Sequence, residues 1–395
     1  MTRRGVWRRA FRDAELLPGN RIRLLQGGAE FFSALIAAID AARVEIHLET
    51  YIFHADASTL AVREALVLAA LRGVRVRVLI DGIGSRDLPA DWLTALRDAG
   101  VAVLVYRPLV TGWRANPRSL RRLHRKLAVV DAAVAFVGGI NLIDDFEPVR
   151  LPAPRLDFSV EVRGPLLARI HPNVRRLWRL VALTQLKTLR RDPVVQPVWP
   201  TDGHIRAAFV VRDNFAHRRD IERVYLAALA LAREEIWLAN AYFLPGRRFR
   251  KLLRKAAARG VKIRLLVQGH TDHPFFQTAA RALYRDLLAA GVAIHEYHAS
   301  ELHAKVAVVD GCWATVGSSN IDPLSLLTAR EANVVVDDQP FAQDLRRRLA
   351  AAFDAAPALD AAAWQRRPRL YRMLSWLAYG AVRAMVGLAG GGRWT

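Results

Sequence analysis

The stretch His124-Arg-Lys-Leu-Ala-Val-Val-Asp131 returns in the second half of the chain as His303-Ala-Lys-Val-Ala-Val-Val-Asp310. Each copy carries a branched apolar run that is typical of a buried strand. On a strand, residues two apart point to the same face, so each histidine and its lysine share a face and the aspartate points to the other. The doubled pattern predicts one site for phosphate chemistry, with two imidazoles and two ammonium groups, built by two similar halves.

The residues after each motif also repeat. Gly138 and Asn141 follow the first aspartate by the same steps as Gly317 and Asn320 follow the second. Only six of the 59 basic residues (Lys+Arg) are lysines, yet both motifs contain one. A lysine ammonium is a compact charge that can hold a phosphate oxygen, unlike the planar guanidinium of arginine.

A longer internal repeat surrounds the motifs. Residues 41–53 resemble residues 231–243, and residues 71–80 match residues 258–267. In each half the pattern predicts three helix–strand steps followed by the motif strand, with a glycine closing several of the helices. The expected class is therefore α/β.

Two arginine-rich segments break the repeat. Thr111 to Arg122 form a segment of the first half that has no counterpart in the second half. It is either a basic loop beside the site or a solvated surface loop. Asn173 to Pro200 link the halves, either as a core helix plus linker or as a basic amphipathic helix that faces lipid.

Composition narrows the class of partner. The net charge of +22 over 395 residues predicts a polyanion, either nucleic acid or an anionic membrane surface. A single cysteine, Cys312, excludes a disulfide framework and a thiolate zinc cluster. Met1 to Asp13 are basic but lack the apolar stretch of a secretory signal, and no apolar run is long enough to predict a membrane span.

The candidate catalytic residues are those of the two motifs: His124, Lys126, Asp131, His303, Lys305 and Asp310. One imidazole can attack phosphorus while the other protonates the leaving alcohol and deprotonates the incoming one. The two lysines would neutralise the non-bridging oxygens, and Asn141 and Asn320 would add neutral donors. The two aspartates are expected to support the local fold or an adjacent turn.

Imidazoles in this role need a carboxylate that fixes their tautomer and orientation. Asp157 follows His124 by 33 positions and Glu331 follows His303 by 28, so these two acids are the candidates. The alternative for Glu331, which lies beside Arg330, is an ordinary surface charge.

With these motifs the chain resembles the phospholipase D superfamily and, within it, the short bacterial cardiolipin synthases of the B type, which lack amino-terminal membrane spans. The resemblance rests on His124 to Asp131, Gly138 to Asn141, Arg212 to Asn214, His217 to Tyr225, Ala239 to Gly246 and Thr315 to Leu326. Two positions depart from the family pattern, because Ala132 replaces a common glycine and Ala329 a common asparagine.

The resemblance implies two tandem phospholipase D-like α/β/α sandwich domains related by a pseudo-twofold axis, with one active site at their interface. The expected parts are an N-terminal domain (1–200), a C-terminal domain (201–360) and a basic membrane-associating tail (361–395). It also implies transfer of a phosphatidyl group from phosphatidylglycerol to a second lipid, with no metal and no cofactor. His124 would be the nucleophile and His303 the general acid and base. The implied partner is an anionic phospholipid membrane, bound peripherally at the cytoplasmic face of the inner membrane.

The tail itself supports a membrane partner. Leu370, Leu374, Leu377, Ala381, Met385 and Leu388 form an apolar stripe opposite Arg372 and Arg383. Trp376 and Tyr379 suit an interface. The alternative is a short helix packed into the core. For the whole chain, the competing functions are a phosphodiesterase acting on nucleic acid and a non-catalytic basic scaffold on membranes.

Overall fold

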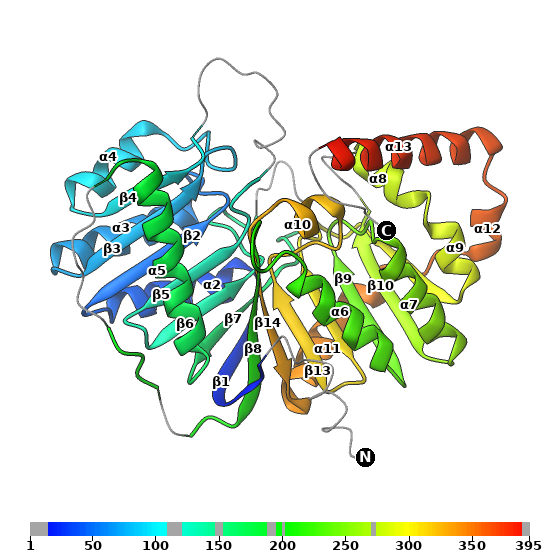
Figure 1. The fold of residues 1–395 in the computed structure, drawn as a ribbon, viewed down its shortest axis with the longest axis horizontal. Helices are drawn as coiled ribbons and strands as arrows, with labels where there is room; N and C mark the ends of the chain where they lie inside the picture. The colour runs from blue at the N-terminus through cyan, green and yellow to red at the C-terminus, as the bar shows by residue number, and fades with distance from the viewer. Residues whose placement is uncertain are drawn as a thin grey trace.

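One twisted sheet runs through the whole protein (Figure 1). The computed structural model describes residues 15–108, 121–146, 153–187, 195–199, 202–269 and 274–388, so most of the expected basic loop, 111–122, lies outside the described residues. The described strands follow the order β11-β10-β9-β12-β13-β14-β8-β1-β7-β6-β5-β2-β3-β4. Counted outward from β1 and from β8, equivalent strands of the two halves follow in the same order, which is the pseudo-twofold symmetry that the resemblance implies.

The first half contributes seven strands and four helices to this arrangement. They are β1 (Leu17–Gln26), α2 (Gly27–Asp40), β2 (Glu45–Thr50), α3 (Ala57–Leu71), β3 (Arg75–Asp81), α4 (Ala90–Asp98), β4 (Ala102–Tyr106), β5 (Lys126–Val130), β6 (Val134–Gly138), β7 (Phe158–Arg163) and α5 (Leu167–Thr184).

The second half repeats that order and adds helices. Its elements are β8 (Ile205–Arg212), α6 (Asp220–Leu231), β9 (Glu235–Asn240), α7 (Arg247–Ala258), β10 (Lys262–Gln268), α8 (Pro274–Arg281), α9 (Tyr284–Ala289), β11 (Val292–Tyr297), β12 (Lys305–Val309), β13 (Trp313–Gly317), α10 (Pro323–Leu327), β14 (Glu331–Asp337), α11 (Gln339–Asp354), α12 (Ala361–Gln365) and α13 (Arg369–Leu388).

The two halves join through β1 and β8, which pair antiparallel. Asn20 seals this seam: its fully buried amide donates to the carbonyl oxygens of Leu17 (2.7 Å) and Ile205 (3.2 Å) and accepts from the Leu166 amide (2.8 Å). The expected pair of α/β units is therefore confirmed, and the structure adds that their sheets are continuous.

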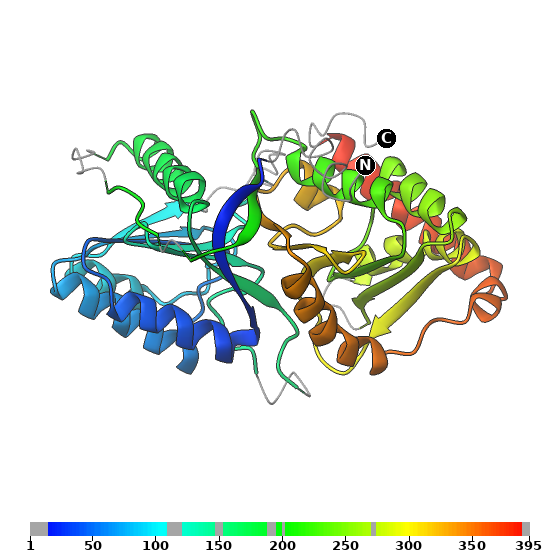
Figure 2. The ribbon, with the colours of Figure 1, turned by 90° about the horizontal axis from the view of Figure 1, so that it is seen from below.

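Helices cover both faces of the sheet (Figure 2). In the first half, α2 and α3 pack on one face and α5 on the other; in the second half, α6 and α7 pack on one face and α11 on the other. One apolar core contains residues from α5, α11 and strands of both halves, so the two units share buried surface as well as a sheet.

Helix α5 settles the alternatives for the arginine-rich link. Its apolar side, with Val174, Leu177 and Val181, is buried against β4, β5 and β6, while Arg176 and Arg179 are exposed. The expectation of a core helix is confirmed. Leu180 (45% exposed) and Leu183 (59%) lie outside this contact, so the lipid-facing alternative stays a prediction for the exposed side.

Helix α13 is attached to the body by one side. Ala378, Tyr379 and Val382 pack against α8, whereas the described members of the predicted apolar stripe are exposed; they are Leu370, Leu374, Leu377, Ala381 and Met385. Leu370 (62% exposed) and Leu377 (61%) are the most exposed apolar residues of this stripe. The expectation that Tyr379 lies at an interface is wrong, because its ring fills the contact with α8 and is 4% exposed. In the part of the chain that the structure describes, no helix is long and apolar enough to cross a bilayer.

Candidate active site

The two motif histidines lie at the junction of the halves because each is tied to a segment of the opposite half. The amide of His124 donates to the carbonyl of Arg330 (3.0 Å), and the amide of His303 donates to the carbonyl of Leu156 (2.9 Å). Arg330 and Leu156 immediately precede the two candidate acids. These two short parallel bridges therefore place the acid of each half next to the histidine of the other half.

The first exchanged pair is His124 with Glu331. The Nδ1 atom of His124 lies 3.0 and 3.2 Å from the two carboxylate oxygens of Glu331, which is fully buried. The hydroxyl of Ser318 donates to the same carboxylate at 2.5 Å. A carboxylate at Nδ1 fixes the tautomer that leaves the Nε2 lone pair open. The side chain of His124 is 18% exposed, so a substrate can reach the ring.

The second pair is His303 with Asp157, whose atoms Nδ1 and Oδ2 are 2.5 Å apart. The position that matches Ser318 is Gly139 here, and a Cβ atom on it would lie 2.2 Å from an oxygen of Asp157. The glycine therefore makes room for the carboxylate. The amide of Phe158 donates to Asp157 at 2.8 Å and holds it in place.

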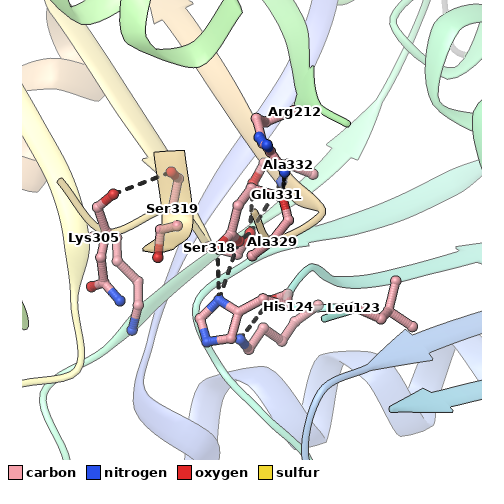
Figure 3. A network of polar contacts seen from close by, with 12 residues as sticks. Leu123, His124, Arg212, Lys305, Ser318, Ser319, Ala329, Glu331 and Ala332 are labelled. Atoms are coloured by element: carbon pink, nitrogen blue, oxygen red, sulfur yellow. Dashed lines mark hydrogen bonds and ion pairs between the residues drawn. The ribbon is translucent and has the colours of Figure 1, made fainter. Parts of the chain in front are cut away.

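Both lysines are buried within the site. The ammonium of Lys126 donates to the carbonyl of His124 at 2.6 Å, and that of Lys305 donates to the carbonyl of His303. Figure 3 shows the Lys305 side chain entering the space beside the His124 ring and Glu331. The expected sharing of one face by histidine and lysine is confirmed, and four cationic or ionisable groups from two halves meet at one place.

Burial governs the protonation of these groups. Desolvation, aided by the two lysines, lowers the pKa of His124 and lowers that of His303 further. Desolvation and the neighbouring Lys305 bring the pKa of Lys126 to about 7, and desolvation brings that of Lys305 to about 8. Burial raises the pKa of Asp157 to about 6, although the ammonium of Lys305 opposes the rise. Near neutral pH the imidazoles are thus unprotonated beside cationic ammonium groups, which is the state a nucleophile needs.

Asn141 and Asn320 are both buried close behind the motif strands. The carbonyl oxygen of Asn141 accepts from the amide of Ile52 at 3.2 Å, which leaves its amide group directed elsewhere. Among the described residues, neither asparagine makes a hydrogen bond to a motif histidine or lysine, so their role as donors to a phosphate remains a prediction.

Asp131 and Asp310 lie at the far end of their strands. The carboxylate of Asp131 accepts three backbone amides, from Arg43, Val44 and Glu45, each at 2.8 Å. Asp310 accepts the three equivalent amides, from residues 233, 234 and 235. Both aspartates therefore close the turn that leads into the neighbouring strand, and their inclusion among the catalytic candidates is not supported by contact with the histidines or lysines.

The comparisons with known proteins agree with this geometry. Residues 35–145 and 225–352 match the family described as "Cardiolipin synthase, PLD-like domain". Cardiolipin synthase B of Escherichia coli K12 is 42% identical over 343 residues, which cover 84% of this chain and 80% of that protein. The chain belongs to the cardiolipin synthase family of phospholipase D-like proteins.

More distant relatives fit this assignment to the cardiolipin synthase family. Cardiolipin synthase 1 of Bacillus anthracis is 30% identical over 359 residues, covering 89% of this chain and 70% of that protein. The crystal structure of phosphatidylserine synthase from Haemophilus influenzae Rd KW20 matches with a TM-score of 0.68 over 98% of this chain and all of that one. Because the identity there is 14%, this likeness shows a common fold only.

Several residues near the active site of this cardiolipin synthase family member were not predicted from the sequence. The ring of Tyr51 lies 4.9 Å from that of His124 and 5.4 Å from the Lys126 ammonium. The buried carboxylate of Asp81 binds the Arg122 guanidinium and the Leu123 amide, which fixes the chain just before His124. Tyr51 follows a predicted strand, and the equivalent position in the second half is Ala241. This difference between the halves at the end of a strand could have indicated that Tyr51 belongs to the site.

Proposed function

We propose that this protein is a cardiolipin synthase, which transfers the phosphatidyl group of phosphatidylglycerol to the headgroup hydroxyl of a second phospholipid and releases glycerol. The observation that carries the proposal is the reciprocal pairing of His124 with Glu331 and of His303 with Asp157 around two buried lysines. Two oriented imidazoles on opposite sides of a phosphate are what a double displacement requires.

In the first displacement, Nε2 of His124 attacks the phosphorus of phosphatidylglycerol. The bond from phosphorus to the glycerol oxygen breaks. His303, which takes up a proton when the phosphodiester anion enters the site, supplies the proton that glycerol carries away. Lys126 and Lys305 stabilise the charge that accumulates on the non-bridging oxygens. The product of this step is a phosphatidyl-histidine.

In the second displacement, the headgroup hydroxyl of another lipid attacks the same phosphorus. His303, now neutral, accepts the proton of that hydroxyl, and the bond between phosphorus and His124 breaks. The enzyme returns to its starting protonation state. If the attacking lipid is phosphatidylglycerol, the product is cardiolipin. The charge stabilisation comes from side chains of the chain itself, so the proposed reaction uses no metal and no organic cofactor.

The route to the substrate is a peripheral contact with an anionic membrane at the cytoplasmic face of the inner membrane. Supporting this, α13 holds its outward apolar stripe next to Arg366, Arg367 and Arg369, a pattern that fits a helix lying in the headgroup region. The net charge of +22 acts in the same direction.

The test is an assay of the purified protein with phosphatidylglycerol vesicles in buffer containing a metal chelator. We expect equal amounts of cardiolipin and glycerol. Absence of cardiolipin, together with hydrolysis of single-stranded DNA under the same conditions, would assign the site to nucleic acid instead.

A further inference from the structure

A cavity of about 410 Å³ opens beside the active site and plays no part in the chemistry described so far. It is formed by the end of β8, the loop that follows and the start of α6. Its lining contains four arginines and one acid; the residues are Arg212, Phe215, Ala216, Arg218, Arg219, Asp220 and Arg223. Most of them belong to Arg212–Asn214 and His217–Tyr225, two stretches that the proposed mechanism leaves without a role.

The carboxylates of this segment are already engaged. Asp213 accepts the backbone amides of Phe215 and His217, and Asp220 lies 2.7 Å from Nδ1 of His217. Glu222, the remaining acid, lies 4.0 Å from the guanidinium of Arg219. Arg218 and Arg223 are exposed at the cavity, and the guanidinium of Arg223 lies 3.5 Å from the carboxylate of Asp220. Clustered guanidinium groups favour a phosphate, which they can bind through two parallel hydrogen bonds.

The cavity lies one strand away from the catalytic carboxylate. Arg212 is the direct cross-strand partner of Glu331 in the pairing of β8 with β14. Figure 3 shows Glu331 between Arg212 and the His124 ring. The guanidinium of Arg212 is anchored on the carbonyl of Ala329 and on the Asn214 side chain (2.9 Å). The cavity therefore lies at the same end of the sheet as the carboxylate that orients His124, one strand away from it.

An apolar side chain lies at the same cavity. Phe215 is 76% exposed, so its aromatic ring contributes no burial of apolar surface to the stability of the fold. Arginines with an adjacent exposed aromatic ring suit an amphiphile that has a phosphate and an acyl region, because each part then finds a matching surface.

We infer that this cavity binds the phosphodiester of the acceptor lipid, and that it makes the enzyme select an anionic phospholipid as acceptor. The inference rests on the proposed function. In cardiolipin the two phosphodiesters are joined by one glycerol, so an acceptor phosphate bound next to the site places the glycerol hydroxyl within reach of the phosphatidyl-histidine. Water and small alcohols lack this anchor and react without it.

The test measures how the phosphatidyl-histidine is partitioned. Wild type and the double variant Arg218→Gln/Arg223→Gln receive phosphatidylglycerol in neutral-detergent micelles with added ethanol. Glycerol release counts all first displacements, while cardiolipin, phosphatidylethanol and phosphatidic acid report the acceptor. We expect the ratio of cardiolipin to glycerol to fall about tenfold in the variant, which corresponds to the loss of charge-assisted hydrogen bonds, with phosphatidylethanol rising in its place.

Two further variants complete the design. Arg218→Lys/Arg223→Lys keeps the charge and should recover much of the cardiolipin ratio. Arg176→Gln/Arg179→Gln removes the same charge from exposed positions of α5 and should leave the ratio at the wild-type value. An unchanged ratio in the first variant would overturn the inference, as would an equal loss of cardiolipin and phosphatidylethanol, which assigns the cavity to the donor. Failure of the proposed function is distinct, because the wild type would then release no glycerol.

Discussion

The carboxylate of Asp157, in the first half of the chain, holds the imidazole of His303, in the second half, at 2.5 Å. Glu331 does the same for His124 in the opposite direction. Neither half therefore contains a complete imidazole–carboxylate pair of its own. Such a site forms only when β1 and β8 pair and join the two halves into one sheet. The catalytic pairs therefore depend on the tertiary fold.

Replacing either orienting acid by its amide should damage catalysis without changing the shape of the site. In Asp157→Asn and Glu331→Gln the side chain no longer holds a charge at Nδ1, so the imidazole loses its fixed tautomer. We expect glycerol release to fall on the order of 10²- to 10⁴-fold in each. Steady-state rates, with circular dichroism to monitor the fold, check this. Activity within a factor of two of wild type would show that the pairing is structural only.

The two histidines should differ in what survives their removal. His124→Ala and His303→Ala are each expected to lower turnover on the order of 10³-fold or more. With a lipid that carries a 4-nitrophenol leaving group, which departs without a proton, His303→Ala should still form a phosphatidyl-histidine and His124→Ala should not. Acid-labile, alkali-stable label from a ³²P-phosphate substrate reports the intermediate. The reverse result would exchange the two roles.

The buried lysines predict a narrow pH range for the free enzyme. With a pKa of about 7 for Lys126 and about 8 for Lys305, the ammonium groups are lost as pH rises through these values, and kcat/KM falls. Asp157, with a pKa of about 6, becomes protonated as pH falls and releases its hold on His303. We expect a maximum of kcat/KM between about pH 6 and 7. The basic limb of kcat should lie higher, because a bound phosphodiester anion favours the charged lysines. A kcat/KM that still rises above pH 8 would contradict this assignment.

The sequence predicted the two halves, the motif strands and the two histidines and two lysines of the site, because these follow from local periodicity and a repeated spacing. It could not predict which acid serves which histidine. Asp157 and Glu331 follow their own motifs at similar distances, and only the joined sheet carries each across to the other half. The expectation that Tyr379 lies at an interface failed for the same reason. Helical spacing predicts which residues share a face, but the packing of α8 determines which face is buried.

Gly139 offers a test of how closely Asp157 is fitted. In Gly139→Ala the new Cβ atom would lie 2.2 Å from a carboxylate oxygen, so Asp157 must move away from His303. We expect glycerol release to fall at least about tenfold, and Tm to drop by a few degrees because the buried acid loses its place. Gly380→Ala is the matched control, since a Cβ there meets nothing within 4 Å and activity should be retained. Normal activity in Gly139→Ala would show that the carboxylate has room to shift.

The outward face of α13 predicts how the protein reaches lipid. Leu374 (51% exposed) and Leu377 (61%) are exposed in an open groove between α13 and α8, outside the buried contact, so Leu374→Gln/Leu377→Gln removes apolar surface without opening the core. If this face enters the headgroup region, losing two leucines should weaken binding to phosphatidylglycerol vesicles by about tenfold or more. Sedimentation with vesicles measures this, and activity on lipid in detergent micelles should stay near the wild-type value. The exposed pair Leu68→Gln/Leu71→Gln on α3 is the control of equal chemistry. Equal binding by all three proteins would exclude α13 from the membrane contact and leave attraction to the +22 charge as its source.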